Sequence, residues 1–483
     1  MTALSAAALG TLDARVGVPA YDRGRLVGSI VHLGVGNFVR AHLASYLDEV
    51  AQSGTTSWGI VGAGVRQHDR QIAATLAAQD HLYTLVQRGE DTADVRVIGS
   101  LLDHLAGGEP DRTEVRLAAP ETRIVSLTIT EAGYPIDADG HFDPASSQAG
   151  PDSAIAVVVR GLRLRHDAGQ GPLTVLSCDN IVGNGDVTRA AVLGVAERLD
   201  TALAGWIERN VAFPNSMVDR ITPATTDADR AWLASTHGIE DRWPVMTEPF
   251  RQWVLEDTFA ADRPPLEQLD VLLTSDVRPY ERMKLHLLNA AHSCLAYPAA
   301  LLGFGRVDHA MADPLVERLV RCYLDTEGGP VVPPVPGIDL DAYRSTLVQR
   351  FRNPAVADQV SRLCQDGSAK LPTFVLPVVR EQRTRQGPIG IAALAVASWC
   401  VYLAGGVGDI VTEPAPDPLL DTLSLHARAA DDDPREFLRL RRVFGDLDRD
   451  ERFVAAFLDA HRRLRDGGVR RAIEAAIDGS VAG

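Results

Sequence analysis

Lysine is almost absent from this sequence. The chain has 483 residues and 48 basic side chains, of which only Lys284 and Lys370 are lysines. Lysine is normally among the commonest residues, so this chain uses arginine wherever a plain positive charge is enough. Arginine stays protonated, whereas a buried lysine can lose its proton and act as a base. We therefore expect the two lysines to have roles that arginine cannot fill; the alternative is chance survival at neutral positions.

Cysteine is scarce as well, and its spacing excludes two classes of site. The five cysteines are widely separated and form no CxxC pair: Cys178, Cys294, Cys322, Cys364 and Cys400. This disfavours both a disulfide framework and a zinc site, so we expect reduced, mostly buried thiols. The sequence also lacks HExxH and clustered His and Cys ligands, and we predict no metal. The absence of GxxxxGK[ST] argues against a P-loop kinase.

Long apolar runs are missing too. No window approaches roughly eighteen uninterrupted apolar residues, and the first residues lack the basic and apolar regions of a signal peptide. The formal net charge of −16 repels nucleic acid and anionic lipid. We expect a soluble cytoplasmic protein with no nucleic-acid or membrane partner.

The chain divides into an α/β half and a helical half. Short apolar runs alternate with helical patterns in the first half, as in a parallel α/β sheet. The predicted strands are Ser29 to Leu33, Trp58 to Val61, Val95 to Ile98, Ile124 to Thr130 and Leu173 to Ser177, with a first helix from Leu43 to Val50. After about residue 275 the pattern predicts helices at Arg282 to Leu302, Asp313 to Leu324, Asp341 to Arg350, Ala355 to Cys364, Ile389 to Leu403, Pro434 to Phe444 and Glu451 to Leu464. The charged region from Asp431 to Arg471 is expected to be solvated surface.

The first predicted strand runs into a glycine turn. Gly34 and Gly36 follow that strand and precede a helix, which places backbone N–H groups where a pyrophosphate can bind. The third glycine of the dinucleotide fingerprint is replaced by Val39, so a simple tight turn remains an alternative. Asp69 follows the next strand and is a candidate partner for the adenosine ribose hydroxyls; the alternative is a solvated loop carboxylate.

The segment from Tyr280 to His292 contains several candidate catalytic side chains on one predicted helix. On a regular helix Glu281, Lys284, Asn289 and His292 fall within an arc of about 140°. The intervening leucines and alanines indicate a buried helix, where desolvation would favour the neutral form of the lysine amine. Such a lysine suits a general base, and the Asn289 amide could stabilise a developing alkoxide. The alternative is a polar face turned to solvent or to a domain interface.

Two further sequence patterns concern the same chemistry. Tyr280-x-x-x-Lys284 mimics the pair of short-chain dehydrogenases, but the TGxxxGxG start and the single short domain of that class are missing. Asn180 comes just after a predicted strand, where ligands bind in open α/β sheets, and could be a second oxyanion donor. A turn stabilised by Asp and Asn side chains is the alternative there.

Seven segments together resemble one known family. They are GVGNFVRAH at 34–42, SLTITEAGY at 126–134, SCDN at 177–180, FPNSMVDRITP at 213–223, EPFRQWVLED at 248–257, PYERMKLHLLNAAH at 279–292 and DGSAKLP at 366–372. They are similar to the polyol-specific long-chain dehydrogenase/reductase (mannitol dehydrogenase) family. The resemblance implies a Rossmann-type dinucleotide-binding domain over residues 1–278 and a mainly α-helical substrate-binding and catalytic domain over 279–483. It also implies NAD as the cofactor and a monomer or weak homo-oligomer.

The resemblance also implies roles for individual residues. Lys284 corresponds to the general base, Asn180 and Asn289 to the oxyanion-hole amides, and Glu281 to a carboxylate that gates proton escape. Asp219, Arg362 and Lys370, with Asn180 and His292, correspond to positions that hold the polyol. We expect cofactor contacts at Gly34, Gly36, Asn37, Phe38, Asp69 and Glu131. Relatives that prefer NAD often have two adjacent acids where this chain has His68 and Asp69; Asp69 alone should still disfavour a ribose 2′-phosphate.

The implied reaction is the oxidation of a polyol secondary alcohol to a ketose, with D-mannitol to D-fructose as the first expectation. D-Arabinitol dehydrogenases and fructuronate or tagaturonate reductases share the predicted helix from Tyr280 to His292, here called the lysine helix, and remain alternatives. A protein of another class, a silent NAD-binding sensor, is the third reading.

Overall fold

The computed structural model describes residues 1–54, 56–64, 69–90, 92–106, 110–137, 140–407, 410–411 and 413–482. The chain forms two compact units, Met1–Arg278 (unit 1) and Pro279–Gly483 (unit 2). Within the described residues, no helix is both long enough and apolar enough to cross a membrane.

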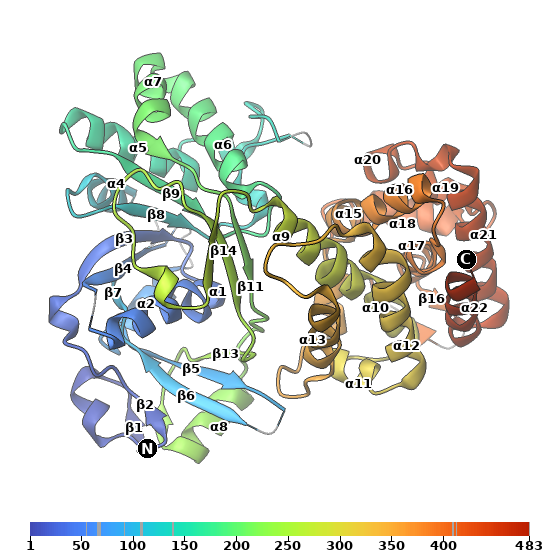
Figure 1. Cartoon of the computed structure of the whole chain (residues 1–483), viewed down its shortest axis with the longest axis horizontal. Coiled ribbons are helices and arrows are strands. Elements are labelled where there is room, and N and C mark those ends of the chain that lie inside the picture. The colour runs from blue at the N-terminus through green and yellow to red at the C-terminus, as the bar shows by residue number, and fades with distance from the viewer. Residues whose placement is uncertain are drawn as a thin grey trace. The chain divides into compact units, whose positions relative to one another are not determined.

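The core of unit 1 is a six-stranded parallel sheet in the order β10-β9-β8-β3-β4-β7 (Figure 1). Its strands are β3 (Val27–Leu33), β4 (Trp58–Ala63), β7 (Leu101–Leu105), β8 (Ile124–Leu127), β9 (Leu173–Ser177) and β10 (Val211–Ala212). Numbered by their place along the chain, these strands follow the Rossmann order 3-2-1-4-5-6. The order reverses between β3 and β8, so the crevice at the carboxyl ends of these two strands is the expected ligand position.

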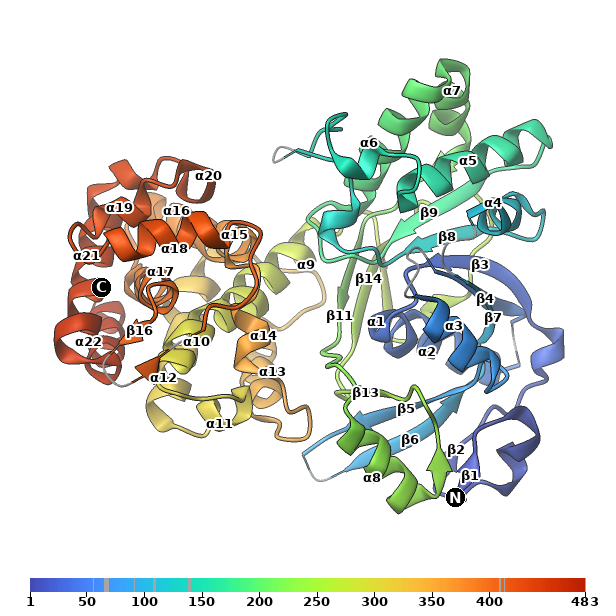
Figure 2. The same ribbon diagram turned by 180° about the vertical axis from the view of Figure 1, so that it is seen from behind.

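Helices cover both faces of this sheet, because the strands are apolar on both sides. The helices of unit 1 are α1 (Asn37–Ala41), α2 (Leu43–Gln52), α3 (Asp69–Ala77), α4 (Pro110–Ala118), α5 (Ala154–Asp167), α6 (Asn184–Leu199), α7 (Thr201–Asn210) and α8 (Asp227–His237). Val31 and Val125 pack with α4 to α7, whereas their neighbours Ile30 and Ile124 pack with α1 to α3. Figure 2 shows the two groups of helices on opposite faces.

Smaller sheets complete unit 1. A four-stranded sheet has the order β13-β5-β6-β2, and a three-stranded sheet has the order β11-β14-β15. Their strands are β2 (Val16–Gly17), β5 (Tyr83–Arg88), β6 (Ala93–Ile98), β11 (Ser216–Asp219), β13 (Val245–Thr247), β14 (Gln252–Glu256) and β15 (Val271–Thr274), and β1 (Thr2–Ala3) pairs with β12 (Ile239–Glu240). The predicted strand at Val95 to Ile98 therefore exists, but it pairs antiparallel with β5 and lies outside the six-stranded parallel sheet, here called the nucleotide sheet.

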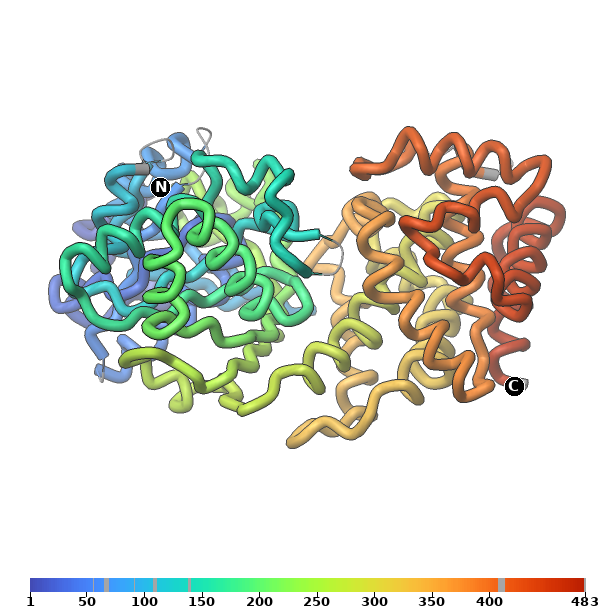
Figure 3. Tube along the Cα trace, turned by 90° about the horizontal axis from the view of Figure 1, so that it is seen from above, coloured from blue at the N-terminus to red at the C-terminus, as the bar shows by residue number. Residues whose placement is uncertain are grey.

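Unit 2 is built from helices, seen as successive coils from yellow to red in Figure 3. They are α9 (Arg278–Met283), α10 (Ala290–Leu301), α11 (Val307–Met311), α12 (Pro314–Cys322), α13 (Leu340–Arg352), α14 (Val360–Cys364), α15 (Gly367–Lys370), α16 (Leu376–Arg385), α17 (Gly390–Leu403), α18 (Leu420–Ala429), α19 (Arg435–Leu438), α20 (Arg441–Phe444), α21 (Glu451–Gly467) and α22 (Val469–Ala482), with a short hairpin of β16 (Gly406–Val407) and β17 (Ile410–Val411). Three π-helical segments interrupt this pattern: η6 (Lys284–Asn289), η7 (Tyr323–Gly328) and η9 (Leu371–Val375).

Helix α17 lies at the centre of unit 2. It has no charged side chain, and every residue from Ile391 to Leu403 is buried. An apolar helix buried on all sides needs partners for its first N–H groups. The carboxylate of Glu327, fully buried on η7, accepts hydrogen bonds from the N–H groups of Ile391 (2.6 Å) and Ala392 (2.9 Å). The hydroxyl of Ser480 donates a third bond to it (2.9 Å).

The helical predictions need three corrections. The helix expected from Ala355 covers only Val360–Cys364, because Asn353-Pro354 and a positive φ of 53° at Ala357 precede it. The helix expected from Pro434 to Phe444 consists of two short helices, α19 and α20. The region expected to be solvated contains α21, which packs on α17 and buries Phe453 and Phe457. All five cysteines are free and buried, as predicted.

Candidate functional site

The glycine turn of unit 1 is held against the neighbouring strand. Gly34 follows β3 with φ of +92°, and a Cβ at this position would lie 2.1 Å from the carbonyl oxygen of Thr128. Only glycine allows this close approach. Gly36 is the N-cap of α1, and the nearest atom to a Cβ there is the Gly34 carbonyl oxygen at 4.0 Å. The turn is thus closed on the side of β8 and leaves room beside Gly36.

A buried histidine, His32 on β3, supports this turn through hydrogen bonds with neighbouring hydroxyls. The His32 ring contacts the hydroxyls of Ser126 (Nδ1, 2.8 Å) and Thr128 (Nε2, 2.9 Å), and the Thr128 hydroxyl donates to the Gly34 carbonyl at 2.7 Å. Burial lowers the pKa of His32 to about 3, so the ring is neutral. His32 is therefore a packing residue of the sheet core and supports the glycine turn.

Arg40 engages the side chain of Asn37. The Arg40 guanidinium is buried and donates to the side-chain oxygen of Asn37 (2.7 Å) and to the carbonyl of Gly36 (3.2 Å). The Asn37 amide in turn donates to the carbonyl of Pro223 at 3.2 Å. Phe38 stacks on His42, with ring centroids 5.0 Å apart. Both residues predicted to contact the cofactor thus also make contacts that hold α1 in place.

The structure brings the other candidates of unit 1 to the carboxyl edge of the nucleotide sheet. Asp69 is the first residue of α3 after β4 and is partly exposed. Glu131 begins a 3-10 turn after β8, and Asn180 follows β9; both are exposed. His68 lies outside the described residues. Since all three strands are parallel, these side chains share one edge of the sheet with the glycine turn.

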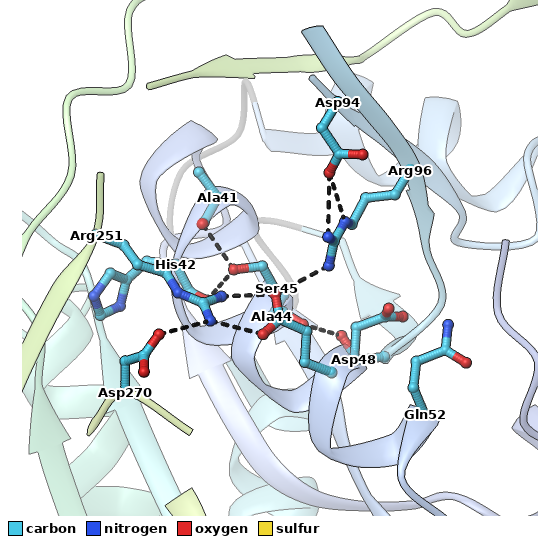
Figure 4. Close-up of polar contacts among 12 residues, drawn as sticks. Ala41, His42, Ala44, Ser45, Asp48, Gln52, Asp94, Arg96, Arg251 and Asp270 are labelled. Carbon is cyan, nitrogen blue, oxygen red and sulfur yellow. Dashed lines mark hydrogen bonds and ion pairs between the residues drawn. The ribbon is translucent and has the colours of Figure 1, made fainter. Parts of the chain in front are cut away.

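Asp219 ends strand β11 and is buried at 4% exposure. The next residue, Arg220, connects this strand end to α1, because its guanidinium donates to the carbonyl of Ala41 and the carbonyl of Glu248. The Ser45 hydroxyl also bonds the carbonyls of Ala41 (2.9 Å) and His42 (2.8 Å), where α1 breaks from α2 (Figure 4). The chain directly after Asp219 is thereby tied to the helix that follows the glycine turn.

In unit 2 the lysine helix is not regular. Helix α9 continues into π-helix η6, which begins at Lys284 and ends at Asn289, and the chain returns to α-helix in α10. At the end of η6 the N–H of Ala290 donates to the carbonyl of Leu285, five residues back. The prediction of a uniform 100° step per residue is therefore wrong over this segment. π-Helical turns inside α-helices are frequent at functional sites.

Burial differs among the four polar residues of this helix. Glu281 is 5% and Lys284 8% exposed, whereas Asn289 and His292 are partly exposed. The prediction of a buried lysine helix is confirmed. His286 is buried, and its carbonyl accepts a hydrogen bond from the hydroxyl of Tyr323 on η7.

Arg362 and Lys370 lie together in unit 2. The ammonium of Lys370 donates to the carbonyls of Arg362 (3.3 Å) and Leu363 (3.4 Å). The guanidinium of Arg362 forms two hydrogen bonds with the carboxylate of Asp358, at 2.6 and 2.5 Å. Burial alone would raise the pKa of Asp358, but the hydrogen bonds and charge of Arg362 keep it below its usual value.

Sequence reasoning missed two residues here. Asp358, four positions before Arg362, holds that guanidinium, and this spacing on its own could have suggested an ion pair. Phe351 on α13 stacks on the His292 ring, with centroids 3.9 Å apart and planes inclined by 19°. No sequence pattern pointed to Phe351, because its contact depends on how α13 packs against α10.

The short-chain dehydrogenase interpretation fails on Tyr280. This tyrosine is 2% exposed, and its hydroxyl donates to the carbonyl of Pro336 at 2.9 Å. It therefore has a structural partner within the helical unit. Among the described residues, no three His, Cys, Asp or Glu side chains form a group that could hold a metal ion.

The strand order and the glycine turn define a Rossmann-type dinucleotide-binding unit, followed in the chain by a helical unit that carries a buried lysine. Two family models match nearly the whole chain: the mannitol dehydrogenase Rossmann domain over residues 28–268 and the mannitol dehydrogenase C-terminal domain over residues 276–465. The chain belongs to the mannitol dehydrogenase family.

Individual relatives agree with this assignment. The mannitol 2-dehydrogenase of Aspergillus fumigatus is 40% identical, over 97% of this chain and 96% of the relative. Among solved structures, a ternary complex of Pseudomonas fluorescens mannitol 2-dehydrogenase with NAD and D-mannitol matches with a TM-score of 0.92 and 41% identity, over 99% of this chain and 100% of that one. A substrate-free D-sorbitol dehydrogenase matches with a TM-score of 0.88 and 35% identity, over 98% and 100%.

Proposed function

We propose that this protein oxidises a secondary alcohol of a polyol to a ketose with NAD, and reduces the ketose in the reverse direction. D-Mannitol and D-fructose are the preferred pair. The observation that carries the proposal is the buried Lys284, within one helix that also bears Glu281, Asn289 and His292, in a chain similar over its full length to an enzyme that binds NAD and D-mannitol.

The residues of unit 1 fit a dinucleotide. The turn from Gly34 to Gly36 leaves room for a close approach of a pyrophosphate to backbone N–H groups, because no side chain projects at Gly36. Asp69, at the start of α3 after the next parallel strand, can accept hydrogen bonds from the adenosine ribose hydroxyls. Its negative charge would repel a 2′-phosphate, which favours NAD over NADP. Asn37, Phe38 and Glu131 complete the proposed contacts.

Lys284 serves as the general base. When bound, NAD supplies the nicotinamide that accepts the hydride from the carbinol carbon. The amine of Lys284 takes the hydroxyl proton, so the alcohol loses one proton and one hydride and becomes a ketone. A lysine with only 8% of its surface exposed suits this role, because desolvation favours the neutral amine. No metal is needed, because the amides of Asn180 and Asn289 stabilise the alkoxide and polarise the ketone in reduction.

Four further side chains hold the polyol: Asp219, His292, Arg362 and Lys370. Their donors and acceptors match a chain of hydroxyl groups, and Phe351 and Asp358 keep His292 and Arg362 in place. Glu281, buried one helical turn before Lys284, gates the escape of the proton from the lysine to solvent.

D-Sorbitol is the second candidate substrate, because a D-sorbitol dehydrogenase also matches the whole chain. D-Mannitol and D-sorbitol differ only at C2, and oxidation at that carbon gives D-fructose from both. The two candidates therefore differ in the face of the ketone to which the hydride is delivered.

The test uses this difference. Purified protein is given D-fructose and deuterated NADH, and the labelled hexitol is identified by chromatography and mass spectrometry. D-Mannitol as the product supports the proposal, whereas D-sorbitol replaces its preferred substrate. The same assay with D-arabinitol, fructuronate and tagaturonate, each with the matching cofactor, covers the remaining family substrates. NADH binding without turnover of any of these substrates would refute an enzymatic role and indicate a sensor.

A further inference from the structure

Thr130 has a backbone conformation that is almost restricted to glycine. It follows β8, with φ of 65° and ψ of 162°. A residue with a branched Cβ is strained in this region, and such strain persists only where the surroundings impose it. The Thr130 side chain is exposed, so packing in the core does not impose it. The cause must lie in what holds the backbone.

The carboxylate of Asp179 holds this backbone. Asp179 follows β9, the neighbouring strand, and is 7% exposed. One of its oxygens accepts the N–H of Thr130 at 2.8 Å, and the other accepts the N–H of Ile129 at 3.0 Å. The Tyr134 hydroxyl donates a third bond at 2.7 Å. A buried carboxylate with three donors can impose a conformation that the chain would otherwise leave.

The backbone of Asp179 is fixed as well. Its carbonyl accepts a hydrogen bond of 3.1 Å from the side chain of Asn184, and this amide also bonds Ser216 at 2.9 Å. The carboxylate of Asp179 therefore joins the end of β8 to the end of β9, and its carbonyl fixes the end of β9 to α6. These are the two strand ends that carry Glu131 and Asn180, the residues next in sequence to Thr130 and Asp179.

We propose that Asp179 is a positioning residue, whose carboxylate holds Thr130 in its strained conformation and so sets the directions of Glu131 and Asn180. This inference rests on the proposed function, because Asn180 is there an oxyanion donor and Glu131 a cofactor contact. In this role Asp179 acts through the two strand ends and needs no contact of its own with substrate or cofactor. Small displacements of such groups cost large factors in rate.

The test is a double-mutant cycle with Asp179→Asn and Thr130→Gly. An asparagine side chain has only one oxygen, so it cannot accept both N–H groups as the carboxylate does. We expect D179N to lower kcat by about 10- to 100-fold. T130G should keep kcat within about threefold of wild type, because glycine adopts this conformation without strain. In the T130G background, D179N should cost clearly less than it does alone, because no strained residue remains to be held.

Asp48 provides a matched control. This carboxylate, buried on α2, accepts the hydroxyl of Tyr21 and the N–H of Gly99 at 2.8 Å. Asp48→Asn should lower the melting temperature without changing kcat. If D179N does not fold, Tyr134→Phe and Tyr21→Phe give the same comparison, since each removes one hydroxyl donor and leaves the carboxylate; only Tyr134→Phe should lower kcat.

Equal losses from D179N in both backgrounds, or a D179N enzyme that loses stability but not kcat, would overturn the role of Asp179. A change in substrate KM alone, with kcat and NADH affinity intact, would also contradict it. A wild-type chain without turnover refutes the proposed function itself, and this role with it. An active wild type with an unimpaired D179N refutes only the inference.

Discussion

The hydroxyl of Tyr323 donates a hydrogen bond of 2.9 Å to the carbonyl of His286, two residues after Lys284 in the π-helical segment η6. Both residues are buried in unit 2. A π-helical turn shifts the backbone bonds from i→i+4 to i→i+5, so carbonyls in the turn need partners from elsewhere. Tyr323 is such a partner, and it is itself the first residue of a second π segment, η7.

We predict that Tyr323→Phe lowers both the free energy of unfolding and kcat. The variant leaves the His286 carbonyl without its tyrosine donor, which should lower the free energy of unfolding by about 1–3 kcal/mol. It should also lower kcat, because η6 sets the direction of Lys284. Urea unfolding and initial rates measure the two effects. If stability falls and kcat does not change, the π segment does not depend on this bond to orient the lysine.

Replacing the two lysines should change different kinetic parameters. Lys284→Ala should lower kcat by about 10²- to 10⁴-fold, the usual contribution of a general base, while NADH affinity stays unchanged. Lys370→Ala should mainly raise the KM of the polyol, because this lysine is proposed to hold substrate. Steady-state rates and NADH fluorescence titration distinguish the two. A Lys284→Ala enzyme with normal turnover would exclude the lysine as the base.

Asp358→Asn should raise the polyol KM by about tenfold, with a smaller change in kcat. Without the carboxylate, Arg362 loses the two charge-assisted bonds that orient it. Asp313→Asn is the control, because Asp313 pairs with Arg470 and its side chain also caps α12, a bond that asparagine can keep. Equal KM values for the two variants would show that Arg362 needs no orienting partner.

Alanine at the two glycines of the turn should separate folding from cofactor binding. Gly34→Ala places a methyl group against the Thr128 carbonyl and should lower the free energy of unfolding by more than about 3 kcal/mol. Gly36→Ala meets no nearby atom and should fold normally, yet bind NADH at least about tenfold more weakly. Thermal unfolding and fluorescence titration test both; full NADH affinity in Gly36→Ala would place the pyrophosphate elsewhere.

We predict that Asp179 makes the stability of the folded chain fall as the pH rises through the range in which its carboxyl loses a proton. Burial, opposed by its hydrogen bonds, raises the pKa of this carboxyl from 3.8 to about 6. Between about pH 4 and 6 the folded chain therefore binds more protons than the unfolded chain, so this contribution to stability falls as the pH rises. Relative to D179N, the wild type should lose up to about 3 kcal/mol across this window and stay level above it. Denaturant unfolding of both proteins at several pH values measures the difference; a constant difference would mean an ordinary pKa for Asp179.

The nucleotide sheet could be predicted from the sequence because its strands are short β-branched runs whose ends coincide with turn residues. Ser29 to Leu33 and Leu173 to Ser177 lie within or match β3 and β9. The lysine helix was predicted by its buried leucines and alanines. The π turn within it was not, because an i→i+5 turn depends on a partner 37 residues further along the chain, Tyr323. No local pattern encodes that contact.

The same reason explains the residues that sequence reasoning missed. A local turn stabilised by Asp and Asn side chains was the alternative interpretation at Asp179 and Asn180, yet the donors to Asp179 come from residues about 50 positions earlier. Phe351 lies one residue beyond the helix predicted from Asp341 to Arg350, and only the structure shows that it belongs to α13 and stacks on His292. Charged helices near the C-terminus suggested a solvated surface, whereas their apolar stripe, with Phe453 and Phe457, covers the uncharged helix α17.

The five enclosed thiols make this chain convenient for spectroscopic labelling. All are free and buried, and burial raises the pKa of each, so the reactive thiolate is suppressed at neutral pH. A cysteine introduced on the surface of either unit would react with maleimide dyes far faster than any native one. A donor and an acceptor fluorophore, one on each unit, could then report the separation of the units with and without dinucleotide, and no native cysteine would have to be replaced first.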